Sequence, residues 1–79
     1  MNTYKINYNG NSSRFKGRTE EVRANSEKEA VHKFYEKFLE YNYFLQDDGS
    51  VKDCNGITIA EPNDNYIKFD GGYFEAELI

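Results

Sequence analysis

The sequence has few of the residues that support disulfides, metal sites and membrane spans. With one cysteine (Cys54) and one histidine (His32) in 79 residues, it can form no internal disulfide and cannot supply the ligands of a structural zinc site. No apolar run approaches the roughly 20 residues of a membrane helix. The polar start also lacks the apolar segment of a signal peptide. We therefore predict a cytoplasmic protein that uses no metal, no cofactor and no membrane.

Tryptophan is absent, but other aromatic residues are plentiful. Seven tyrosines and six phenylalanines make up 16% of the chain, although its mean hydropathy is −0.91. A disordered tail would carry few aromatic residues, so we predict one folded domain over residues 1–79. A domain of this size buries only about 60% of the surface of its unfolded chain, which leaves little room for a deep catalytic cleft. We expect such a protein to act by binding through its surface.

Charge is divided unevenly along the chain, whose net charge is −4. Residues 1–39 hold eight basic and five acidic residues, a net +3, whereas residues 40–79 hold two basic and nine acidic residues, a net −7. A polarised surface steers charged partners and raises their encounter rate. The same division also fits ordinary solubility.

The first part of the chain predicts a hairpin followed by a helix. Thr3–Tyr8 alternates apolar and polar residues as a half-buried strand does, and a second strand is expected over residues 14–24, with Gly17 as a bulge. Ser26 and Glu29 form a capping box, which predicts a helix from about residue 27 to residue 43. Its apolar stripe is Ala30, Val31, Phe34, Phe38, Tyr41 and Leu45, flanked by Tyr35, Leu39 and Tyr43.

The second part of the chain predicts further antiparallel strands. Residues 51–60 form one irregular strand or a small edge hairpin around Asn55-Gly56, and residues 66–69 and 73–78 form a second hairpin. The fold class is therefore α+β: ββα followed by two or three strands, with one helix on one face of an antiparallel sheet of four to five strands. Ile67, Phe69, Phe74, Ala76 and Leu78 should face the helix. Tyr66, Tyr73, Lys5, Lys68, Glu75 and Glu77 should face away.

No group of residues predicts catalysis. Cys54 and His32 could share a site, but we expect a half-buried strand residue and a solvated helix residue instead. The acidic loops lack the spacing and the closing glutamate of a calcium loop. The turn at Asp70-Gly71-Gly72 is no phosphate loop. We therefore predict that the protein is not an enzyme and has no catalytic residues.

Two charged surfaces remain as candidate binding sites. If the acidic residues of the second half gather on one side, they could imitate a row of phosphates and occupy a basic channel that normally holds DNA or RNA. The predicted contact residues are the acids Asp47, Asp48, Asp53, Asp64 and Glu75, with the aromatic anchors Tyr43, Tyr66 and Tyr73. The alternative is nucleic-acid binding by the basic N-terminal hairpin, through Lys5, Arg14, Lys16 and Arg18 with Tyr8 and Phe15 stacking on bases. An ordinary acidic surface and self-association through a free sheet edge also remain open.

A strand at residues 4–6, a second strand ending in V-R-A-N-S-E-K-E-A at residues 22–30 and a helix resemble the layout of small phage and mobile-element proteins, including some anti-CRISPR proteins. The resemblance covers about the first 40 residues. It implies a stoichiometric inhibitor in a bacterial host cell that binds a protein or ribonucleoprotein defence complex. Such an inhibitor is a monomer or small homo-oligomer, and it blocks nucleic-acid binding or nuclease action without an active site.

Overall fold

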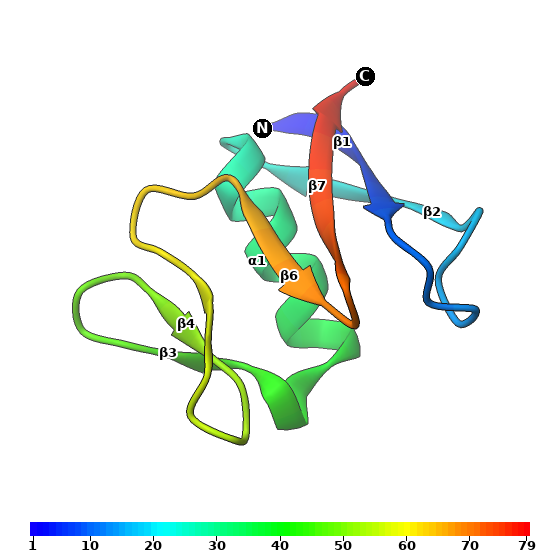
Figure 1. Cartoon of the computed structure of the whole chain (residues 1–79). Coiled ribbons are helices and arrows are strands. Elements are labelled where there is room, and N and C mark those ends of the chain that lie inside the picture. Colours follow the sequence, from blue (N-terminus) through cyan, green and yellow to red (C-terminus); the bar gives the residue numbers. More distant parts are fainter.

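The computed structural model describes residues 1–79 as one helix and seven strands in two antiparallel sheets (Figure 1). The elements are β1 (Asn2–Asn9), β2 (Thr19–Ala24), α1 (Glu27–Phe38), the 3₁₀ turn η1 (Glu40–Asn42), β3 (Phe44–Leu45), β4 (Val51–Lys52), β5 (Thr58–Ala60), β6 (Tyr66–Phe69) and β7 (Gly72–Leu78). The predicted α+β class is confirmed, and so is a four-stranded antiparallel sheet. However, five strands follow the helix, rather than two or three.

The four-stranded sheet joins the two ends of the chain. Its strand order is β2-β1-β7-β6, so the two predicted hairpins meet where β1 pairs with β7, from Tyr4 opposite Leu78 to Asn9 opposite Tyr73. The two termini consequently lie beside each other (Figure 1). Asp70 and Gly71 both have positive φ, 46° and 76°, which is the geometry of a tight type I′ hairpin turn. Strands β2 and β6 therefore form the two edges of the sheet.

The helix begins as predicted but ends early. The Ser26 Oγ accepts a hydrogen bond from the Glu29 backbone N–H at 3.1 Å, and the Glu29 carboxylate accepts one from the Asn25 N–H at 3.2 Å. The helix ends at Phe38, not near residue 43, because the Leu39 backbone (φ −132°, ψ 43°) leaves the helical region. Leu39 and Tyr35 are buried, whereas Tyr41 is 82% exposed.

This early end overturns the predicted apolar stripe. Ala30, Val31 and Phe34 are buried as expected, but Phe38, Tyr41 and Leu45 are exposed. The helix covers one face of the four-stranded sheet, and beyond Phe38 the chain turns away to build the second sheet (Figure 1). Apolar spacing continues along the sequence there, but the backbone leaves the helical conformation at Leu39.

An aromatic cluster forms the centre of the core. Phe74 lies with its ring centroid 5.0 Å from those of Phe15 and Phe34, and 5.2 Å from that of Tyr8. Phe15 was expected inside a strand over residues 14–24. Instead β2 begins at Thr19, and Phe15 extends from the β1–β2 loop into the core, where it is only 4% exposed. Gly17 (φ 79°) belongs to this loop and is not a strand bulge.

Residues 44–60 form the second sheet, in the order β3-β4-β5. Asn55-Gly56 turns the chain between β4 and β5, as the Asn-Gly pair predicted, and the segment 51–60 is therefore a small hairpin. Its buried residues Val51, Ile59 and Ala60 join the same core as the helix and the large sheet. The pairing of β3 with β4 was not predicted, because β3 is only two residues long.

Candidate functional site

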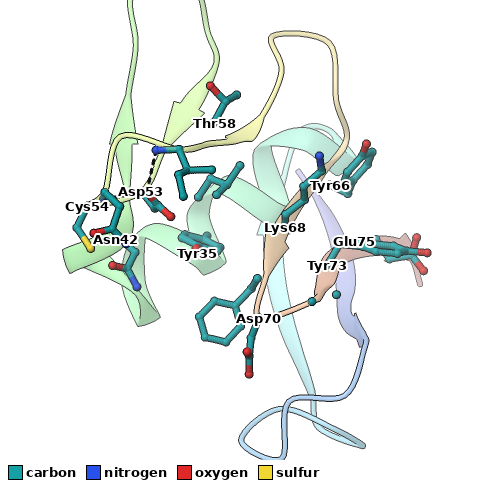
Figure 2. A pocket seen from close by; sticks show the side chains of 16 residues that line it. Tyr35, Asn42, Asp53, Cys54, Thr58, Tyr66, Lys68, Asp70, Tyr73 and Glu75 are labelled. Atoms are coloured by element: carbon teal, nitrogen blue, oxygen red, sulfur yellow. Dashed lines mark hydrogen bonds between the residues drawn. The ribbon is translucent and has the colours of Figure 1, made fainter.

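An open groove of about 1150 Å³ lies between β6 and the turn that follows β4 (Figure 2). The buried Tyr35 from α1 and the half-buried Phe69 from β6 lie among its lining residues, with their ring centroids 6.5 Å apart. The second sheet supplies one wall, and the β6–β7 hairpin supplies the other. The groove therefore exists only because the chain folds into two sheets that do not join.

Asp53 organises the wall formed by the second sheet. Its Oδ1 accepts hydrogen bonds from the backbone N–H groups of Asn55 and Ile57, at 2.9 and 3.0 Å. These bonds hold the turn after β4, which places the exposed Cys54 and Ile57 at the groove (Figure 2). The Asp53 Oδ2 has no hydrogen-bond partner and remains available to a ligand.

Two tyrosines and two carboxylates form the wall of the β6–β7 hairpin. The Tyr66 and Tyr73 rings meet edge to face, with their centroids 5.4 Å apart. The Glu75 Oε1 accepts a hydrogen bond from the Asn9 Nδ2 at 2.7 Å, which leaves Oε2 without a partner. Asp70, at the hairpin turn, makes no side-chain hydrogen bond, and Lys68 extends from the same strand as Tyr66 (Figure 2).

The groove carries unpaired negative charge. Three carboxylates, from Asp53, Asp70 and Glu75, line it together with a single cation, Lys68. The ion pairs of the chain are Arg18–Glu20 and Lys33–Glu29, so none of these three carboxylates is neutralised by a salt bridge. Unpaired carboxylates beside aromatic rings suit a ligand that offers both cations and apolar surface.

The groove contains no histidine, and its titratable hydroxyl at the floor stays protonated. Burial, reinforced by the charge of Asp53, raises the pKa of Tyr35 to about 12. Tyr35 is therefore neutral at physiological pH, so it acts as a floor residue and not as a base. The one thiol of the groove, Cys54, has no side-chain hydrogen bond to a base.

The structure brings four of the eight predicted contact residues together: Asp53, Tyr66, Tyr73 and Glu75 all line the groove. The acidic residues do not form the single phosphate-like row that the sequence suggested. Asp47 and Asp48 lie in the β3–β4 turn, and Asp64 lies in the β5–β6 loop. These two segments meet, because a Cβ on Gly49 would lie 3.9 Å from Pro62.

The acids outside the groove mainly stabilise local turns. The Asp48 Oδ1 accepts hydrogen bonds from the Ser50 N–H at 2.9 Å and the Ser50 Oγ at 2.6 Å, which lowers the pKa of Asp48. The Asp64 Oδ2 accepts one from the Glu61 N–H at 2.9 Å. Asp47 is exposed and makes no such bond. A second acidic group thus lies apart from the groove.

Tyr43 lies away from the groove and packs on the helix. Its hydroxyl lies 3.1 Å from the His32 Nδ1, and both side chains are partly buried. The prediction that His32 is solvated is therefore wrong. Burial lowers the pKa of His32 and raises that of Tyr43. The His32 Nε2 is buried without a hydrogen-bond partner.

The basic hairpin keeps its cations exposed but not its aromatic rings. Arg14, Lys16 and Arg18 are exposed in the β1–β2 loop, and Lys5 is half-buried on β1 between Glu21 and Glu77 of the neighbouring strands. The expectation that Phe15 stacks on a base is wrong, since Phe15 is part of the core. Tyr8 is also engaged, because its hydroxyl donates to the carbonyl oxygens of Phe69 and Asp70.

Several groove residues were not singled out from the sequence. Asp70 was expected in a turn and among the acids of the second half, but not among the contact residues. Cys54 was expected to be a half-buried strand residue, and Lys68 to face away from the helix. Asn42, from η1, also lines the groove. In the sequence, only the Asn55-Gly56 turn signal indicated the wall formed by the second sheet. The sequence could not show that this turn lies opposite β6, because β6 belongs to the other sheet.

No known protein family, curated protein or solved structure matches the chain. No group of three or more His, Cys, Asp or Glu side chains is arranged to hold a metal ion. The helix is also too short and too polar to cross a membrane. The site therefore has to be interpreted from its own geometry and charge.

Proposed function

We propose that the protein is a small phage-type inhibitor, similar to anti-CRISPR proteins, that binds a host CRISPR effector complex by protein–protein contact. Binding would block the access of nucleic acid or the action of the nuclease. The observation that carries the proposal is the groove with three unpaired carboxylates beside Tyr66 and Tyr73. No cofactor and no covalent chemistry are required.

The physical argument rests on the surface that such a groove can recognise. A channel that holds DNA or RNA is lined with lysine and arginine, and much of its affinity for nucleic acid comes from these charges. Carboxylates at Asp53, Asp70 and Glu75 can pair with the same cations. Tyrosines are favoured interface residues, because they bury a large apolar ring and keep a polar hydroxyl. The groove combines both features.

The test is a pull-down of a purified CRISPR effector complex by the tagged protein, with and without nuclease treatment. We expect the effector to be retained after nuclease treatment, and retention to fall as salt is raised. The variant Asp53→Asn/Asp70→Asn/Glu75→Gln removes the three groove charges but keeps the side-chain oxygens that accept hydrogen bonds from Asn9, Asn55 and Ile57. This variant should lose retention.

The matched control is Glu21→Gln/Glu36→Gln/Glu40→Gln, which removes three exposed charges that make no side-chain hydrogen bond. It should retain the effector as the unmodified protein does. Equal retention by both triple variants would contradict the groove as the binding site. Recovery of nucleic acid alone, lost after nuclease treatment, would favour the basic β1–β2 hairpin and a nucleic-acid accessory role instead.

A further inference from the structure

Tyr35 carries a polar group that the protein does not use in its own fold. The residue packs in the core and is only 1% exposed. Its hydroxyl makes no hydrogen bond within the chain. The one fully buried side-chain nitrogen or oxygen that lacks a hydrogen-bond partner is the His32 Nε2. The Tyr35 hydroxyl is therefore not sealed inside the core, and the small exposed part of this residue includes its oxygen.

The hydroxyl opens into the groove, at the end formed by the second sheet. The charge of Asp53 acts on this hydroxyl, because it contributes to the raised pKa of Tyr35. Figure 2 shows Tyr35 between the turn that follows β4 and the β6–β7 hairpin. We call this part of the groove the inner end, and its lining residues are Tyr35, Asn42, Asp53, Cys54 and Phe69.

The inner end offers hydrogen-bond acceptors and no cation. The Asp53 Oδ1 is occupied by the N–H groups of Asn55 and Ile57, whereas its Oδ2 has no partner. The oxygen of the neutral Tyr35 hydroxyl is a further acceptor. Lys68, the only cation of the groove, is exposed on β6, and three carboxylates with one lysine give the lining a net formal charge of −2. A ligand at the inner end must therefore bring donors and positive charge.

Lysine and arginine are the two side chains that bring both to a protein interface. The arginine guanidinium is planar, has five N–H donors and no acceptor, and can donate to two acceptors at once. It is more weakly hydrated than the lysine ammonium, and it stacks on aromatic rings. Phe69 supplies such a ring, with its centroid 6.5 Å from that of Tyr35. The carboxylate oxygen, the hydroxyl and the ring together favour arginine.

We propose that the inner end of the groove binds an arginine side chain of the partner protein. The guanidinium donates hydrogen bonds to the Asp53 Oδ2 and the Tyr35 hydroxyl oxygen, and it lies against the Phe69 ring. The inference rests on the proposed function and names the anchor by which the groove holds its partner. Arginine is a frequent anchor of protein interfaces, and Asp70 and Glu75 remain available to further cations of the partner.

The test is an NMR titration of the labelled protein with N-acetyl-arginine-N-methylamide, which carries the side chain alone. We expect a Kd of about 1 mM, a typical value for so small a ligand. The citrulline derivative has nearly the same shape without the charge and should bind at least about tenfold more weakly. The lysine derivative keeps the charge without the planar fork and should bind at least about threefold more weakly.

The amide signals locate the bound arginine. The N–H groups of Asn55 and Ile57 donate to Asp53, so their signals should shift as the ligand saturates. The signals of Asp48 and Asp64, two acidic residues outside the groove, should not shift. Equal shifts at all four positions would indicate attraction to any acidic surface and would overturn the assignment.

Two tyrosine variants separate the hydroxyl from the ring. Tyr35→Phe removes only a hydroxyl that makes no hydrogen bond in the chain, so its Tm should change by no more than about 4 °C. The same variant should bind the arginine derivative at least about fivefold more weakly. Tyr41→Phe is the matched control, because Tyr41 is 82% exposed and does not line the groove. This control should bind as the unmodified protein does.

A variant of Asp53 tests the charge. Asp53→Asn keeps a side-chain oxygen for the N–H groups of Asn55 and Ile57 but removes the negative charge. It should bind the arginine derivative at least about tenfold more weakly, and its preference for arginine over citrulline should largely disappear. A purely structural role of Asp53 would weaken both ligands equally and leave this preference unchanged.

Several results would overturn the arginine site. These are a Kd above about 10 mM for the arginine derivative, equal binding of the arginine and citrulline derivatives, or unchanged arginine binding by Tyr35→Phe. Tighter binding of the lysine derivative would assign the inner end to lysine instead. If any of these occurs while the effector is still retained by the unmodified protein and lost by the groove triple variant, only the arginine anchor is wrong. If arginine binds as predicted but no effector is retained, the proposed function is the part that fails.

Discussion

Replacing Phe15 with alanine is expected to destabilise the protein by about 3 kcal/mol, although Phe15 belongs to a loop. Its ring is 4% exposed and lies 5.0 Å from Phe74, 5.4 Å from Phe69 and 6.1 Å from Tyr8, measured between centroids. Removing a buried phenylalanine costs about 3–5 kcal/mol, and the lower end applies because a loop can move into the vacated space. A domain of this length has only about 4–12 kcal/mol of stability.

Thermal unfolding followed by circular dichroism measures this loss. About 3 kcal/mol corresponds to a fall in Tm of about 12–24 °C for a domain of this size. Lys16→Ala is the control, since Lys16 is the exposed neighbour in the same loop and should change stability by no more than about 0.5 kcal/mol. A loss below about 1 kcal/mol for Phe15→Ala would refute the docking of this loop in the core.

Two further predictions concern a close contact and a buried ring. Gly72→Ala should destabilise the protein by about 1–3 kcal/mol in urea unfolding, because the added Cβ would overlap the Asn9 carbonyl oxygen and the Gly10 Cα. An unchanged unfolding midpoint would contradict the close approach of β1 and β7. Burial, with the charge of Lys28, lowers the pKa of His32 below 6.5, so the unfolded chain takes up the proton first and stability falls as pH drops below about 6.5. His32→Gln should reduce the loss of stability between about pH 7.5 and about pH 5.5, and an equal loss in both proteins would refute this assignment.

Local chemistry predicts those parts of the fold whose signals lie within a few residues. Ser26 and Glu29 fix the start of the helix, because the cap forms between neighbours along the chain. The alternation from Thr3 to Tyr8 and the turns at Asn55-Gly56 and Asp70-Gly71 likewise identify strands and hairpins. These elements were predictable from the sequence alone.

Tertiary packing decides the parts that were not predicted. The helix ends after Phe38 without a glycine or proline, because Leu39 is buried and the chain turns toward the second sheet. Phe15 leaves the strand pattern because the aromatic core accepts its ring. Strand β3 has only two residues, which carry no periodicity. None of these outcomes has a local signal in the sequence.

The candidate site was half predicted for the same reason. Tyr66, Tyr73 and Glu75 follow from strand alternation, which places them on the face away from the helix. Asp53 lines the same groove only because the second sheet lies opposite β6. Tyr43 does not line the groove, because it packs on the helix, where its hydroxyl contacts His32. Charge counting along the chain could identify an acidic half but not which carboxylates line the groove.

The measurement that tests the central claim most directly is inhibition of target-DNA binding by a purified CRISPR effector complex. Three proteins are compared, each first checked for unchanged folding: the unmodified protein, the groove triple variant Asp53→Asn/Asp70→Asn/Glu75→Gln and the control triple variant Glu21→Gln/Glu36→Gln/Glu40→Gln. We predict that the groove variant needs at least about tenfold more protein for half-maximal inhibition, while the control variant matches the unmodified protein. Equal inhibition by all three proteins, or no inhibition by the unmodified protein, would contradict the account.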